Sequence, residues 1–207
     1  MAAKIKQIGR VTTASVEKGT GRSWDEWIKI LNKWGASSRA HKDIAQHLKS
    51  KYKLTLWWQQ GVATGFEMHI GRKVEGRNAK GEYSTVASRT FNVDHKKLWD
   101  FLTSDEGQSE WLKPLSSFTF AAGEKFECEG GIFGEIRTMV KARRVRMRWQ
   151  ETDWLKPSIV NIALIPRKNG KSILVFQHDG LKDGRLRLQM RDHWKHVLEH
   201  LLTLNVT

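Results

Sequence analysis

Apolar residues repeat with two different periods along this chain, and the period changes within one short segment. Before Gly71 they recur every three or four residues, which is the spacing of one helix face; after Ser84 they alternate as on a strand. The segment between, GRKVEGRNAKGEYS, is rich in glycine and charge and has no apolar period. We therefore expect a helical part and a sheet-containing part that are joined by a linker.

The first part has the sequence marks of three short helices. Ser23 and Glu26 have the spacing of a capping box and begin the first helix. A second helix is expected at about 40–51 and a third at about 56–70. The expected parts of the chain are a flexible basic arm (1–19), a small helical domain (20–71), a linker (72–84) and a second domain (85–207).

The third expected helix carries two apolar stripes about 100° apart. The stripe expected in the core of the module consists of Trp58, Val62, Gly65, Phe66 and His69. The second stripe is formed by Trp57, Gly61, Thr64 and Met68. Because three short helices cannot bury both stripes, we expect Trp57, Gly61 and Met68 to contact the second domain or a second copy of the chain.

Alternating apolar residues dominate the second part. In RRVRMRW, the side chains of Val145, Met147 and Trp149 share one face and the arginines share the other. One buried and one solvated face are typical of an antiparallel sheet. Helical patterns precede and follow the strands, so we expect an α+β fold whose last helix lies across the sheet.

Composition excludes several classes of protein. The single cysteine, Cys128, forbids an intrachain disulfide and fits a reducing compartment. The N-terminal residues lack the apolar run of a secretory signal, and no window is apolar enough for a membrane span. The expected location is the cytoplasm, with no membrane partner.

Basic charge is concentrated in the first part. The formal net charge is +14, and residues 1–90 hold 17 Lys and Arg against 7 Asp and Glu. Such a surface attracts polyanions, although charge alone gives no sequence specificity. Nucleic acid is therefore an alternative partner rather than the favoured one.

Four motifs in order resemble a known family over residues 85–205. They are RTFNVDHKKLWDFLTSDEGQSEWL, GEIRTMVKARRVRMRW, VNIALIPRKNGKSILVFQHDGL and HWKHVLEHLL. They resemble the heat-shock-protein ATPase activator-like branch of the START/polyketide-cyclase (SRPBCC) superfamily. Residues 20–71, with SWDEWIKILNKWG, HKDIAQHL and WWQQGVATGFE, resemble a small helical family of unknown function.

The first resemblance implies a helix-grip fold, in which a curved antiparallel sheet holds a long C-terminal helix, often around an apolar cavity. We therefore expect a non-enzymatic protein that binds a small hydrophobic molecule, without a cofactor. An apolar core and an apolar cavity look alike in sequence, and both interpretations stay open. The candidate cavity residues are Trp111, Met147, Trp149, Ile162, Leu164, Phe176, His178 and Trp194.

Three motifs bear on catalysis. HVLEH matches a metalloprotease pattern, but His196 and His200 face away from the core side marked by Trp194, which favours a solvated face over a metal site. His178 is expected to be a hydrogen-bonded structural residue rather than a base. Carboxylates on both sides make Cys128 a poor nucleophile, so neither a catalytic residue nor a metal ligand is assigned.

Two other functions remain as alternatives. The basic N-terminal helices could act as a nucleic-acid-binding or regulatory module with a helix-turn-helix layout, although the third helix opens with Leu56, Trp57 and Trp58 rather than base-reading polar residues. A cyclase- or hydrolase-like enzyme is the second alternative, for which no acid–base pair stands out.

Overall fold

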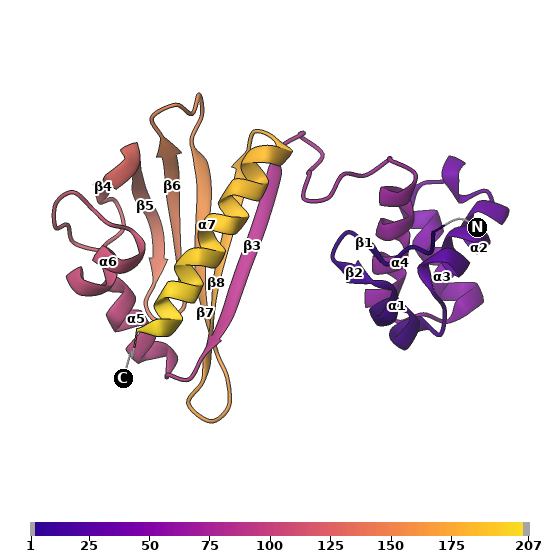
Figure 1. The fold of residues 1–207 in the computed structure, drawn as a ribbon, viewed down its shortest axis with the longest axis horizontal. Coiled ribbons are helices and arrows are strands. Elements are labelled where there is room, and N and C mark those ends of the chain that lie inside the picture. The colour runs from indigo at the N-terminus through magenta and orange to yellow at the C-terminus, as the bar shows by residue number, and fades with distance from the viewer. Residues whose placement is uncertain (1–2, 205–207) are drawn as a thin grey trace. The chain divides into compact units, whose positions relative to one another are not determined.

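The computed structural model describes residues 3–204 and divides into two compact units at Glu75 and Gly76 (Figure 1). The first unit is helical, and the second is an antiparallel sheet with helices, so the chain has the expected α+β class. Each unit has its own hydrophobic core.

Three helices of the first unit lie where the sequence places them. They are α2 (Trp24–Lys33), α3 (His41–Tyr52) and α4 (Leu56–His69), with a 3₁₀ turn, η1 (Ala36–Ser38), after α2. The capping box is confirmed: Glu26 N donates to Ser23 Oγ, and Ser23 N donates to Glu26 Oε2 at 2.8 Å.

The segment expected to be a flexible basic arm is instead folded. It forms a short hairpin of β1 (Gln7–Ile8) and β2 (Val11–Thr12), followed by α1 (Thr13–Thr20). Val16 of α1 is fully buried, and Trp24 Nε1 donates to the carbonyl oxygen of Val11 at 2.9 Å. Apolar residues scattered among the lysines of this segment join the core of the unit, and an interpretation based on charge did not detect them.

The folded arm also covers parts of α4. The indole of Trp58 lies against Gly19 of α1, and the sulfur of Met68 lies against Gly9 of the hairpin. Val62, Gly65 and Phe66 are buried as expected, whereas His69 is exposed. Leu56 and Trp57 remain 72% and 63% exposed. The contact expected for Trp57 with the second domain or with another copy stays a prediction.

The second unit is a helix-grip fold. Its elements are β3 (Tyr83–Phe91), α5 (His95–Thr103), α6 (Asp105–Trp111), β4 (Lys125–Cys128), η2 (Glu129–Gly131), β5 (Ile132–Val140), β6 (Arg144–Glu151), β7 (Ser158–Pro166), β8 (Ser172–Leu181) and α7 (Gly184–Thr203). The strands pair in the order β3-β8-β7-β6-β5-β4, and every pair is antiparallel. The long helix α7 runs across one face of this sheet (Figure 1).

Part of the expected linker belongs to the second unit. Ser84 N donates to the carbonyl oxygen of Gly76 at 2.8 Å, and Asn78 N donates to that of Glu82 at 2.8 Å. The Arg187 side chain of α7 approaches Gly76 so closely that a Cβ there would lie 2.3 Å from Arg187 Nε. Residues 76–82 therefore form a short loop that is anchored before β3 begins.

Two glycines of α4 should respond in opposite ways to alanine. A Cβ at Gly65 would lie 2.2 Å from the indole of Trp24, so Gly65→Ala should lower the free energy of unfolding of this unit by about 2 kcal/mol, as overpacking does. A Cβ at Gly61 would have no heavy atom closer than 3.7 Å. Gly61→Ala should therefore raise the free energy of unfolding by about 1 kcal/mol through helix propensity. Urea denaturation of both variants tests the pair, and equal effects would contradict the packing of α2 on Gly65.

Candidate ligand-binding site

The eight candidate cavity residues lie together in the core between the sheet and the helices. They come from β6, β7, β8, α6 and α7, and each is at most 5% exposed. The rings of Phe176 and Trp194 stack with centroids 4.5 Å apart and planes 8° apart. Trp149 meets Trp194 edge to face at 5.2 Å, and Trp111 lies 5.8 Å from Phe176. These aromatic side chains therefore pack directly against one another in the core.

His178 is held on both sides by hydrogen bonds. Trp194 Nε1 donates to His178 Nδ1 at 3.1 Å, so the neutral ring carries its proton on Nε2. Nε2 then donates to Ser158 Oγ at 2.7 Å, and this hydroxyl donates to the carbonyl oxygen of Trp149 at 2.8 Å. Burial, assisted by His193, lowers the pKa of His178 to about 3. Both ring nitrogens are engaged, which leaves no free base.

Two buried ring nitrogens, Trp149 Nε1 and His193 Nε2, lie near these hydrogen bonds. His193 Nε2 has no hydrogen bond to any residue that the structure describes, and Trp149 interacts with the side chain of Glu151. Both rings lie beside Trp194, with centroids 5.2 Å and 4.6 Å from it. Burial, followed by the charge of His196, lowers the pKa of His193, so this ring is also held neutral.

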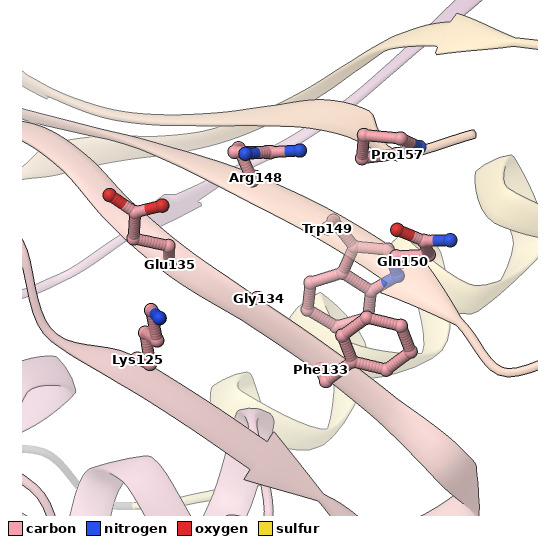
Figure 2. Close-up of a pocket in the computed structure, with 8 residues that line it drawn as sticks. All are labelled: Lys125, Phe133, Gly134, Glu135, Arg148, Trp149, Gln150 and Pro157. Atoms are coloured by element: carbon pink, nitrogen blue, oxygen red, sulfur yellow. The ribbon is translucent and has the colours of Figure 1, made fainter.

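The second unit has a groove of about 250 Å³ on the solvent face of β4, β5 and β6. Figure 2 shows Lys125, Glu135 and Arg148 in a row across three paired strands. Glu135 also accepts a hydrogen bond from Arg137 Nη1 at 2.7 Å. The lining therefore carries two cations and one carboxylate, and this carboxylate is already paired with an arginine outside the groove.

A second hollow, about 330 Å³ in volume, lies at the end of the sheet where β8 leads into α7. Its apolar lining includes Trp154 and Leu186, which are 8% exposed, and Leu155, which is 97% exposed. The full lining consists of Lys80, Gly81, Glu82, Trp154, Leu155, Lys156, Gly180, Lys182 and Leu186.

Lysines dominate the charge around this second hollow. Within residues 3–204, no ion pair joins Lys80, Lys156 or Lys182 to a carboxylate. The one carboxylate of the lining, Glu82, accepts a hydrogen bond from Asn78 Nδ2 at 3.0 Å. Three unpaired ammonium groups beside an apolar floor form a site that favours an anionic group attached to an apolar body.

The HVLEH motif and Cys128 contribute no residue to this hollow. His196 and His200 are exposed on α7, and His200 Nε2 lies 2.6 Å from Glu110 Oε2. In the described part of the chain, no three His, Cys, Asp or Glu side chains are placed to hold a metal ion. Cys128 is buried, and burial raises the pKa of its thiol to about 12.

Sequence reasoning did not find the lining of the second hollow. Its residues come from two loops, around 80–82 and 154–156, from the end of β8 with Lys182 after it, and from the start of α7. Loop residues follow no hydrophobic period, so the alternation of apolar residues in the sequence could not predict that these loops form one lining. The only local signal was an apolar pair, Trp154 and Leu155, inside an otherwise polar turn.

A six-stranded antiparallel sheet that holds a C-terminal helix across one face defines the helix-grip class. The family model described as "Activator of Hsp90 ATPase homolog 1-like protein" matches residues 92–204, which is more than half of the chain. The chain belongs to this family, and its sequence resemblance to the activator-like branch is confirmed.

Solved structures share the fold at low sequence identity. CalU16 from Micromonospora echinospora is 17% identical with a TM-score of 0.53, covering 60% of this chain and 78% of that one. An HSP90 activator from Plasmodium falciparum is 20% identical with a TM-score of 0.50, covering 56% and 91%. The Aha1 dimer from Colwellia psychrerythraea is 14% identical with a TM-score of 0.51, covering 57% and 92%.

A comparison with curated proteins finds no match. Among the described helices, none is both long enough and apolar enough to cross a membrane.

The buried neutral state of His178 predicts a pH-dependent stability. Its pKa falls from the ordinary value of 6.5 to about 3 on folding, so only the unfolded chain takes up this proton between those values. His178 therefore costs no stability above pH 6.5 and costs about 1.4 kcal/mol per pH unit as the pH falls toward 3.

Comparison with a His178→Phe variant isolates this contribution. Between pH 7 and pH 5, the free energy of unfolding of wild type should fall by about 2 kcal/mol relative to the variant. Urea denaturation at both pH values measures the difference. A difference that does not change with pH would contradict the buried neutral imidazole.

Proposed function

We propose that the helix-grip unit is a non-enzymatic binding domain for a small molecule with an apolar body and an anionic group. The site is the hollow lined by Lys80, Trp154, Lys156, Lys182 and Leu186. The observation that carries the proposal is the combination of a nearly buried apolar floor with three unpaired lysines at its margin. Its volume of about 330 Å³ lies within the range of small-molecule pockets.

The family and the fold support a binding role, because a helix-grip domain is suited to holding a ligand beside its C-terminal helix. The proposed ligand position lies at the end of the core and not within it. A ligand lying among the eight residues expected from the sequence would have to separate the stacked rings of Phe176 and Trp194. Such a separation would expose apolar surface and weaken the dispersion attraction between the rings.

Binding is favoured over catalysis by the residue types in the hollow. Its lining contains no Ser, Cys, His or Asp, and Glu82 is exposed and bonded to Asn78. The lining offers neither a hydrogen-bonded nucleophile and base, as acyl transfer requires, nor a pair of carboxylates, as glycosyl transfer requires.

Titration with decanoate and with 1-decanol, followed by isothermal calorimetry, tests the proposal. Decanoate should bind more tightly, because only its carboxylate pairs with the lysines. A Lys156→Ala/Lys182→Ala variant should weaken decanoate binding by about three- to tenfold, which is the size expected for two partly exposed ion pairs. The same variant should leave decanol binding unchanged.

A Lys125→Ala/Arg148→Ala variant is the matched control, because it removes the same charge from the groove of Figure 2. It should bind decanoate as wild type does. Equal weakening in both double variants, or no binding of either compound, would overturn the proposed site.

A further inference from the structure

The start of α4 presents an aromatic ring that no part of its own unit covers. Trp57 is 63% exposed, and its neighbour Leu56 is 72% exposed. The ring of Trp57 meets that of Trp58 edge to face, with centroids 4.3 Å apart. Trp58 is itself fixed against Gly19 of α1. The exposed indole is therefore supported from behind and needs little ordering to receive a planar partner.

Three lysines precede this ring by four to eight residues along the chain. Lys49, Lys51 and Lys53 are exposed at the end of α3 and in the turn before α4. None of them forms an ion pair with a carboxylate in the described part of the chain. Lys53 has a positive φ of 55°, which ends α3 and turns the chain into α4 within three residues.

The carboxylates of this unit are mostly engaged within it. Residues 1–75 hold 14 Lys and Arg against 6 Asp and Glu. Asp25 accepts from Ile5 N, Glu26 belongs to the capping box, Glu67 pairs with Arg72, and Glu75 pairs with Arg10. The excess positive charge is therefore not compensated near α4, and a partner of this surface should be an anion.

We propose that the Trp57 surface, formed by Lys49, Lys51, Lys53, Leu56 and Trp57, binds single-stranded nucleic acid. An unpaired base stacks on the indole of Trp57, and the phosphates on either side of it lie at the lysines. Stacking on an aromatic side chain combined with backbone contacts from lysine is how single strands are held without base-edge reading.

Charge and pattern argue against two other occupants. A second copy would bring like charges together, since this unit holds 14 Lys and Arg against 6 Asp and Glu. An interfacial membrane helix needs an apolar face along its length, whereas beyond Trp57 the outer side of α4 continues with Gln60, Gly61 and Thr64.

Duplex DNA is the remaining alternative. Reading a major groove requires free donors and acceptors at the start of the recognition helix. Here the two most exposed side chains are apolar, and Gln60 Oε1 is held by His41 Nε2 at 2.8 Å. The flat ring is suited to a base face, which only an unpaired strand offers.

Fluorescence anisotropy of the full chain with labelled dT20 at low salt tests the inference. Trp57→Ala should weaken binding by about tenfold, the effect expected for one stacked base, and Trp57→Phe should weaken it less. A Lys49→Gln/Lys51→Gln/Lys53→Gly variant, in which glycine keeps the positive φ, should also weaken binding. It should reduce the slope of log K against log salt by about 0.7 for each phosphate that the variant no longer neutralises.

The matched charge control removes three exposed lysines of the second unit, Lys141, Lys168 and Lys171, by substitution with alanine. It should bind dT20 within about twofold of wild type, because the local contacts are intact. Thermal unfolding verifies that every variant is folded. If one of the two Trp57 variants does not fold, the other still measures the contribution of the indole ring.

Four results would overturn the proposal. If Trp57→Ala does not change the binding of dT20, the binding is a general attraction between a basic protein and a polyanion. Tighter binding to a 20-base-pair duplex would assign the surface to duplex DNA. Tighter binding to phosphatidylserine vesicles, abolished by Trp57→Ala, would assign it to a membrane surface. A fall in oligomer mass with Trp57→Ala, without a change in dT20 binding, would assign it to a second copy of the chain.

Discussion

The indole of Trp194 donates a hydrogen bond to His178 in the middle of the helix-grip core, and this contact joins α7 to the sheet. The Ser158 hydroxyl extends this series of hydrogen bonds from His178 to the backbone of Trp149, so one helix and three strands are connected through a single imidazole. All four residues are buried, so removing any one of them would leave a desolvated donor or acceptor. The contact therefore fixes the position of α7 more strictly than apolar packing would.

The position of α7 determines how the aromatic side chains of this core pack. With Trp194 held at His178, its ring stacks on Phe176 and leaves no room for a ligand between these two rings. The hollow of about 330 Å³ lies instead at the end of the core, beside Trp154. The ring centroid of Trp154 is 5.9 Å from that of His178. A fold that is suited to an internal cavity thus presents an amphipathic hollow at one end, with lysines at the margin and tryptophan as its floor.

The regular elements could be predicted from the sequence because each has a local cause. The capping box at Ser23 and the alternation of Val145, Met147 and Trp149 require no knowledge of the rest of the chain. The prediction of a flexible arm was wrong because the apolar residues of a short hairpin are too few to show a period. The partners of His178 and the lysines of the hollow could not be found, because they meet only through pairings between distant strands and loops.

The rings of Trp149, Phe176 and Trp194 pack against one another in the core, and the proposed ligand lies at the end of this core. Indole N–H resonances of the ¹⁵N-labelled protein during a decanoate titration test this most directly. The Trp154 indole resonance should shift with saturation, while those of Trp149 and Trp194 should stay in place. Saturable shifts of the Trp149 and Trp194 indoles, with Trp154 unchanged, would show that the ligand enters the core and would contradict it.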